Sequence, residues 1–209
     1  MGLISLLFSN PRVFIMLSVL LLYSVIIHEV SHGWIAHLFG DDTAKHYGRL
    51  TLNPVSHLDP IGTLMLFLAG FGWARPVPVN YNSLSRSRFG LVAVALAGCL
   101  ANILIAAIAI FLLQFDKINT NEVFATLLSV LARINIMLGA FNLIPIPPLD
   151  GSKILMGFLP YEAQENLARL EPYGFYILIL LLFTGLLNPV ISFMQSVIYA
   201  LIAFIFKLV

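Results

Sequence analysis

Several apolar runs of this chain are long enough to cross a lipid bilayer, and their length limits the possible folds more than any other feature. Residues 12–39, 89–115 and 122–144 are mostly apolar, and a helix of about 20 apolar residues spans the hydrocarbon core of a membrane. The composition agrees, because 60% of the 209 residues are hydrophobic and 10% are charged. We therefore expect an all-α polytopic membrane protein of the cell membrane. It should be a transmembrane helix bundle with short extended or re-entrant segments, formed by one integral-membrane domain over residues 1–209.

The first apolar run has a clear start and a clear end. Pro11 can occupy the first turn of a helix and Gly40 can follow its last residue, which predicts a helix over residues 12–39. At 1.5 Å per residue this helix is about 42 Å long, enough to span a bilayer with some tilt. Cleavage as a signal peptide would remove this helix together with the histidines that it carries. We therefore expect the segment to be retained in the mature protein.

The longest polar region, residues 41–87, separates the first two apolar runs. Its apolar insert, residues 61–72, is too short to span a membrane and predicts a re-entrant or interfacial segment. The prolines of RPVPVN, residues 75–80, exclude a helix and favour an extended path.

In the second half of the chain, the sequence does not decide where Arg133 lies. Arg133 interrupts the third apolar run, so either it faces the interior of the bundle or the first half of that run lies at the membrane interface. Residues 160–171 predict a short surface helix. Residues 173–206 are apolar again, and Asn188 with Pro189 divides them into two short segments or a kinked pair.

The first predicted helix carries the pattern H-E-x-x-H, at His28, Glu29 and His32. Histidines four residues apart project from one face of a helix, where neutral imidazoles suit Zn²⁺. Glu29 lies beside the first histidine, where its carboxylate can take a proton from a water at the metal. Ionisable side chains inside a membrane segment cost free energy and are functional by default, so three within five residues indicate a shared cation.

Zinc needs a third protein ligand in addition to the two histidines. His46 and His57 lie in the polar loop, whereas His37 lies about 140° round the helix from His32. The stronger candidate is Asp150, in the sequence NLIPIPPLDG, whose prolines force an extended path at membrane depth. The alternative for Asp150 is a helix N-cap, a position that aspartate favours.

Two of these motifs together match a known family. HEVSH (residues 28–32) followed by NLIPIPPLDG (residues 142–151) resembles the site-2 protease family of intramembrane zinc metalloproteases. Residues 46–62, 71–80 and 97–104 are similar to its compact prokaryotic branch, which carries no PDZ or CBS domain.

The resemblance implies one zinc ion per chain, held by His28, His32 and Asp150. It implies that Glu29 is the general base and that Asn142 helps to hold the scissile carbonyl. The implied substrates are transmembrane proteins or peptides in the lipid bilayer, cleaved within or near their membrane-spanning segments.

One residue departs from the family pattern, because Cys99 stands where a proline is usual. A single cysteine forms no internal disulfide, and its neighbours are apolar, so we expect a small buried core residue that touches no ligand. Asn53 and Asn102 can line the cavity, or Asn102 can make a polar contact between helices. His57 and Asp59 can gate access or cap a loop, and the loop role is favoured.

Two functions of other classes compete with proteolysis. A membrane metal transporter could use the same His and Asp site, but a general base beside the ligands has no obvious use in ion permeation. An inactive membrane adaptor would not need intact motifs. The formal net charge of +1 argues against a nucleic-acid partner, and the sequence carries no signal for an oligomeric state.

The basic residues predict the orientation of the chain, because Lys and Arg near span ends favour the cytoplasm. If the first helix crosses once and residues 61–72 do not cross, one side holds Lys45, Arg49, Arg75, Arg86, Arg88, Lys153 and Arg169 and the other Arg12 and Lys117. We therefore expect the N-terminus outside and residues 41–87 in the cytoplasm. The metal site should lie towards the cytoplasmic leaflet.

Overall fold

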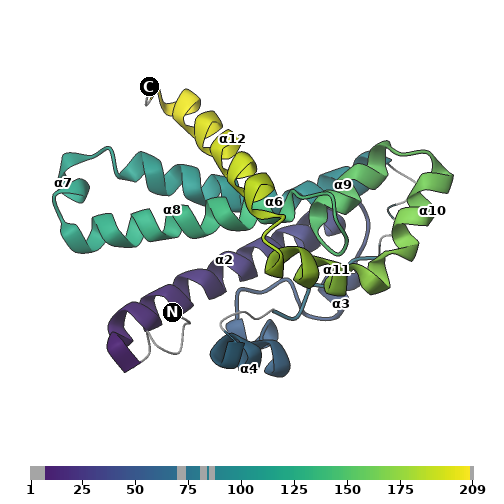
Figure 1. Ribbon diagram of the computed structural model, residues 1–209, viewed down its shortest axis with the longest axis horizontal. Helices are drawn as coiled ribbons and strands as arrows, with labels where there is room; N and C mark the ends of the chain where they lie inside the picture. The colour runs from purple at the N-terminus through teal and green to yellow at the C-terminus, as the bar shows by residue number, and fades with distance from the viewer. Residues whose placement is uncertain (1–7, 70–73, 81–83, 85–87, 208–209) are drawn as a thin grey trace.

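The computed structural model describes residues 8–69, 74–80, 84 and 88–207 (Figure 1). Within these ranges the regular secondary structure is helical and there is no strand. One isolated antiparallel bridge joins Leu58 and Ala74. In chain order the helices are α2 (Pro11–Leu38), α3 (Thr43–His46), the 3₁₀ helix η1 (Pro54–Ser56), α4 (Pro60–Ala69), α6 (Arg88–Leu112), α7 (Asp116–Asn119), α8 (Glu122–Asn142), α9 (Asp150–Phe158), α10 (Tyr161–Arg169), α11 (Glu171–Phe183) and α12 (Asn188–Phe206).

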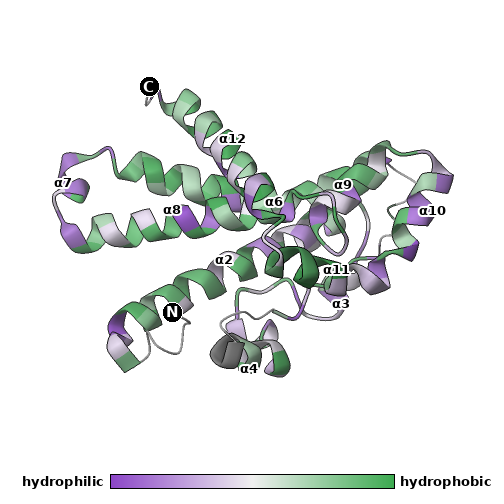
Figure 2. Ribbon diagram, viewed as in Figure 1, coloured by the Kyte–Doolittle hydropathy of each residue, from purple (hydrophilic) through white to green (hydrophobic). Residues whose placement is uncertain are grey.

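Four of these helices, α2, α6, α8 and α12, are long and apolar enough to cross a membrane. The pair α10 and α11, bent by 64°, brings the number to five if it is one span. These helices consist mainly of hydrophobic residues (Figure 2), and some of them are exposed, as on α6, where Leu100, Leu104 and Ile108 are exposed. An apolar exterior is what a lipid environment requires, so the expected polytopic helix bundle is confirmed.

The first helix begins and ends as its sequence predicts. Asn10 caps it, accepting a hydrogen bond from Val13 N at 3.3 Å, and Pro11 occupies the first turn. Gly40 follows with φ +90°, a left-handed conformation that glycine adopts without strain. The resulting helix of 28 residues carries the H-E-x-x-H pattern near its C-terminal end.

The bundle core is built where α6, α8 and α12 meet. Helices α6 and α8 run side by side as a hairpin closed by α7 (Figure 1). Their contact is lined by small side chains such as Ala106 and Ala140, on which Ile198 and Ile202 of α12 pack. Small residues let helices approach closely in lipid, where packing drives association.

Two details of the second half differ from expectation. Arg133 is exposed on an unbroken α8, so of the two alternatives left open by the sequence, the one in which it faces the bundle interior does not hold. Ala132, Asn135 and Gly139 occupy the inward face instead. The apolar C-terminal region is two helices, as predicted, but the break precedes Asn188, which begins α12.

The polar region after α2 wraps round the end of the bundle. Helix α4 has 10 residues and is too short to span a membrane, as predicted, although residues 70–72 of that insert lie outside the described residues. Residues 75–80 form no helix, as their prolines require, and no strand. Residues 71–73 and 81–83 of this region, and 85–87, also lie outside the described ranges.

Candidate metal centre

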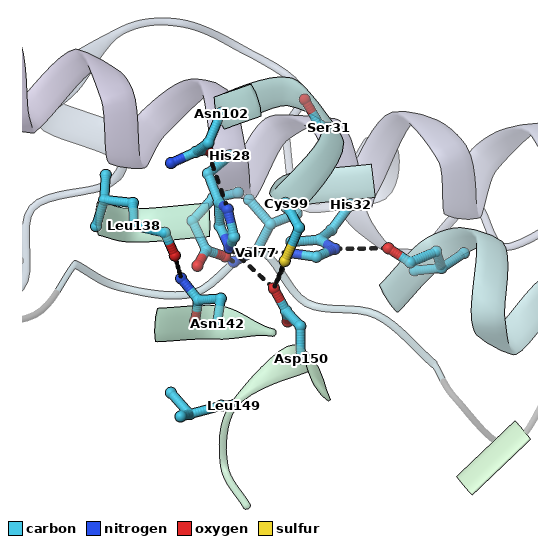
Figure 3. A network of polar contacts seen from close by, with 12 residues as sticks. His28, Ser31, His32, Val77, Cys99, Asn102, Leu138, Asn142, Leu149 and Asp150 are labelled. Carbon is cyan, nitrogen blue, oxygen red and sulfur yellow. Dashed lines mark hydrogen bonds and ion pairs between the residues drawn. The ribbon is translucent and has the colours of Figure 1, made fainter. Parts of the chain in front are cut away.

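Three side chains converge at the end of the bundle where α2, α6 and α9 meet (Figure 3). His28 Nε2 lies 3.1 Å from His32 Nε2 and 3.1 Å from Asp150 Oδ2, and His32 Nε2 lies 3.2 Å from the same oxygen. Ligands bound tetrahedrally at 2.0–2.2 Å from zinc are about 3.3 Å apart. The two nitrogens and one oxygen therefore form a triangle of the size that one zinc ion needs.

The hydrogen-bond partners of the two imidazoles orient them for a metal. His32 Nδ1 lies 2.7 Å from the carbonyl oxygen of Val94, and His28 Nδ1 lies 3.2 Å from Asn102 Oδ1. Both partners are acceptors, so each Nδ1 carries the hydrogen. Each Nε2 then presents a lone pair to the centre of the triangle, as metal-binding histidines do.

Helix α6 reaches the two histidines because it has no side chain at Gly98. A Cβ there would lie 2.4 Å from His32 Nε2 and 2.5 Å from His28 Cε1. Any other residue would push α6 away or displace the imidazoles. The close approach also places Asn102, one turn further along the same face, against His28.

Cys99 corrects one of the expectations. It is buried, as predicted, but its Sγ lies 3.7 Å from Asp150 Oδ2, so the prediction that it touches no ligand is wrong. The thiol donates to the carboxylate because the approach of α6 at Gly98 brings the neighbouring residue to the same place.

Asp150 is brought to the histidines by a sharp return of the chain after α8. It is the first residue of α9, where Leu149 occupies the N-cap position, so its carboxylate does not cap that helix. The return is tight at Gly151, where a Cβ would lie 2.3 Å from the carbonyl oxygen of Leu143. Only glycine allows that approach, and it fixes where Asp150 lies.

The other histidines considered as third ligand lie elsewhere. His37 pairs with Asp42, His46 is exposed, and His57 is buried with its Nε2 2.8 Å from the carbonyl oxygen of Thr51. Across the described ranges, the one group of three or more His, Cys, Asp or Glu side chains that could hold a metal ion is His28, His32 and Asp150.

Two further polar residues have local roles in the loop. Asp59 Oδ1 accepts a hydrogen bond from Gly62 N at 2.8 Å, the capping role favoured from the sequence. Asn53 Oδ1 accepts one from Val55 N at 3.2 Å and caps η1 rather than lining the cavity.

A cavity of about 490 Å³ opens onto the site. His28, Glu29 and Asn142 are among its polar lining residues, and the rest of its lining is mainly apolar, including Leu21, Leu22, Val25, Leu58, Leu138 and Phe141. Glu29 Oε2 accepts a hydrogen bond from Val77 N at 2.9 Å, and Asn142 Nδ2 donates to Leu138 O at 3.1 Å. A carboxylate and an amide thus share one apolar cavity with a metal ligand.

Of the contacts that α6 makes with the site, sequence reasoning offered only that of Asn102, whose polar contact between helices was one of two alternatives and is the one observed. Val94, Gly98, Cys99 and Asn102 all reach it. These residues are four, one and three positions apart, the spacing of one helix face. That spacing is the sequence signal that could have identified their contacts with the site.

Comparison with known proteins places the chain in a family. Residues 114–185 match the profile of peptidase family M50. YwhC of Bacillus subtilis (strain 168) is 41% identical over 177 residues, which cover 81% of this chain and 81% of that protein. Rip2 of Mycolicibacterium smegmatis is 32% identical over 185 residues, covering 86% and 71%. Both are provisionally named as zinc metalloproteases.

For a third relative, the matched region is a smaller share of that protein's length. The zinc metalloprotease MJ0392 of Methanocaldococcus jannaschii is 28% identical over 182 residues, which are 86% of this chain and 45% of that protein. No solved structure matches the chain. The extent of the similarity to YwhC and the matched profile confirm the resemblance drawn from the motifs, and the chain belongs to peptidase family M50, the site-2 proteases.

Proposed function

We propose that this protein is an intramembrane zinc metalloprotease that hydrolyses peptide bonds within or near transmembrane segments of other membrane proteins. One observation carries the proposal. His28 Nε2, His32 Nε2 and Asp150 Oδ2 form a triangle that could hold a metal ion, and His28 lines an apolar cavity together with Glu29, on a helix of membrane-spanning length.

The ligand triangle would hold one zinc ion per chain. When bound, zinc would supply a Lewis acid that lowers the pKa of a water towards about 7 and polarises the scissile carbonyl. His28 and His32 contribute neutral nitrogens, because the oxygens of Asn102 and Val94 keep hydrogen on each Nδ1. Asp150 contributes negative charge to the same site.

Glu29 and Asn142 perform the remaining chemistry in this proposal. The Glu29 carboxylate lines the cavity beside His28, where it can take a proton from the attacking water and deliver it to the leaving amine nitrogen. Asn142 lies on the same cavity wall, and its amide can donate to the oxygen that gains charge during attack.

The cavity favours an unwound, apolar stretch of substrate. It follows α2 from Ser18 to Glu29, eleven residues apart, a distance of about 16 Å along the helix. An extended peptide rises about 3.3 Å per residue, so roughly five residues fit this length. Carbonyls of an intact substrate helix are hydrogen bonded, so the helix has to unwind before attack.

The test uses purified protein in lipid nanodiscs with a model transmembrane substrate. Cleavage should stop when a zinc chelator removes the ion and return when zinc is added. Cleavage that survives complete removal of zinc would contradict the proposal. Zinc uptake into sealed vesicles that depends on His28, with no cleavage of any substrate, would favour a transporter instead.

We also propose an orientation with the N-terminus outside and the metal site towards the cytoplasmic leaflet. In Figure 1, α3 and α10, which carry Lys45 and Arg169, lie at one end of the molecule, and α7, with Lys117, at the other. This separation supports the basic-residue argument, because Lys and Arg favour the cytoplasmic side.

A further inference from the structure

The segment of residues 75–80 lies against α2 and contacts the carboxylate assigned as general base. Pro76 and Pro78 have no N–H, so Val77 supplies the one backbone donor between them. That donor lies 2.9 Å from Glu29 Oε2. One oxygen of the Glu29 carboxylate is therefore held by the segment, and the other is left for chemistry.

Arg49 fixes the segment immediately before this donor. Its side chain is buried, and its Nη2 donates to the carbonyl oxygens of Arg75 at 2.7 Å and Pro76 at 3.2 Å. These carbonyls belong to the two peptide units that precede Val77 Cα, and the second of them also contains the Val77 N–H. Both bonds come from Nη2, one nitrogen of the planar guanidinium fork, which carries two N–H groups and so can serve two acceptors.

The far end of the segment is tied down separately. Asn80 N donates to Asp41 Oδ2 at 2.6 Å. Burial raises the pKa of Asp41, but hydrogen bonds from Thr43 and Asn80 outweigh it and hold that pKa below its ordinary value. The acceptor is thus an ionised carboxylate at neutral pH, and the segment is held on both sides of Val77.

The surface of α2 is shaped to receive the segment. Gly33 lies one turn after Glu29, and a Cβ there would approach Val77 Cγ1 to 2.8 Å. The missing side chain lets buried Val77 lie flat on the helix. Its N–H can reach Glu29 for that reason.

We propose that Arg49 is a positioning residue for proteolysis: it fixes the Arg75 and Pro76 carbonyls so that the Val77 N–H holds the Glu29 carboxylate at the cavity. The inference rests on the proposed function, since it assigns Glu29 as the base. Arg49 is neither one of the three candidate ligands nor a residue that lines the cavity, although its charge interacts with the Glu29 carboxylate.

The first measurement follows the contact itself and needs no catalysis. In hydrogen–deuterium exchange, fragments that span residues 76–78 report on the Val77 amide alone in that stretch, since the prolines have none. We expect Glu29→Ala to speed exchange at Val77 at least tenfold, and Arg49→Gln to do the same. The exposed Lys45 of the same polar region offers a matched control, and Lys45→Gln should leave the exchange unchanged.

The second measurement separates positioning from a general loss of structure. Arg49→Gln should retain full zinc occupancy, lower kcat about tenfold and change KM less than twofold. Arg49→Lys keeps the charge but not the fork, and its kcat should be intermediate. Lys45→Gln should match wild type.

Unchanged Val77 exchange in Arg49→Gln, or faster exchange with an unchanged kcat, would overturn the assignment of Arg49. A loss of zinc in step with kcat would also overturn it, because that result indicates a structural role. If the wild-type protein cleaves no substrate, the proposed function fails, and the exchange data still decide whether Arg49 holds the Val77–Glu29 contact.

Discussion

The two histidine ligands are oriented by partners of different kinds. His28 is held by the side chain of Asn102, and His32 by the main-chain carbonyl of Val94. A substitution of Asn102 can remove the side-chain oxygen that His28 contacts. A substitution of Val94 keeps the main-chain oxygen that His32 contacts. The site therefore has one orienting contact that mutation can remove and one that mutation leaves in place.

Asn102→Ala should weaken zinc binding by about 10- to 100-fold, the usual effect of losing the hydrogen-bond partner of a metal-bound histidine. Val94→Ala is the matched control, because it trims a buried side chain on the same helix and keeps the carbonyl. Competition with a fluorescent chelator measures both affinities. Equal affinities in the two variants would show that the Asn102 contact does not orient His28.

Glu29→Gln should keep zinc and lose proteolysis. Glu29 is not one of the three converging ligands, so metal content should match wild type, while loss of a general base lowers the rate by about 10²- to 10⁴-fold. Metal analysis and cleavage of the model substrate on one preparation provide the two values. Near-normal cleavage by this variant would remove the general-base assignment.

Asn142→Ala should lower kcat by roughly 10²-fold with zinc still bound, if the amide stabilises the developing oxyanion. The native amide also donates to Leu138 O within α8, so helix content should be checked by circular dichroism. An effect confined to KM would instead assign Asn142 to substrate binding in the ground state.

At the residue scale, the sequence was most informative where a motif has fixed spacing. His28 and His32 share a helix face by spacing alone, and Asp150 was favoured because a metal lacked a ligand. Cys99 was misjudged because its contact with Asp150 depends on how closely α6 approaches the start of α9. That distance is set by packing between segments, which local sequence does not encode.

At the scale of elements, α6 is the helix that supports the site, and Gly98 determines its distance from α2. Gly98→Ala places a methyl group within 2.4–2.6 Å of both imidazoles, so zinc content and thermal stability should both fall. Gly139→Ala in α8 is the control, because its nearest neighbour would be 3.5 Å away. It should be tolerated, since alanine favours helix over glycine by about 1 kcal/mol.

Both variants can be measured by thermal unfolding in nanodiscs together with metal analysis. Full zinc occupancy in Gly98→Ala would mean that α6 or the histidines can move to make room. Helix boundaries themselves were predictable, since Pro11 and Gly40 bound α2 within one residue of expectation. The position of Arg133 was not, because its face depends on which side of α8 meets α6.

At the scale of the whole molecule, the orientation in the membrane is open to direct test. In a Cys99→Ser background, single cysteines replace exposed Tyr47 and exposed Asn119, which lie on opposite sides in the proposed topology. A membrane-impermeant maleimide added to intact cells should label position 119 and spare position 47. Permeabilised cells should label both, and the reverse pattern in intact cells would contradict the orientation.

The proposed zinc ligands are far apart in the chain, and this fixes an order of events during synthesis. His28 and His32 leave the ribosome well before Asp150, and at about 5–20 residues per second the delay is roughly 6 to 24 seconds. Until Asp150 arrives, the nascent chain holds a histidine pair without its third partner. In the proposed function, hydrolysis would therefore have to wait until the chain has been synthesised past α6 and α8.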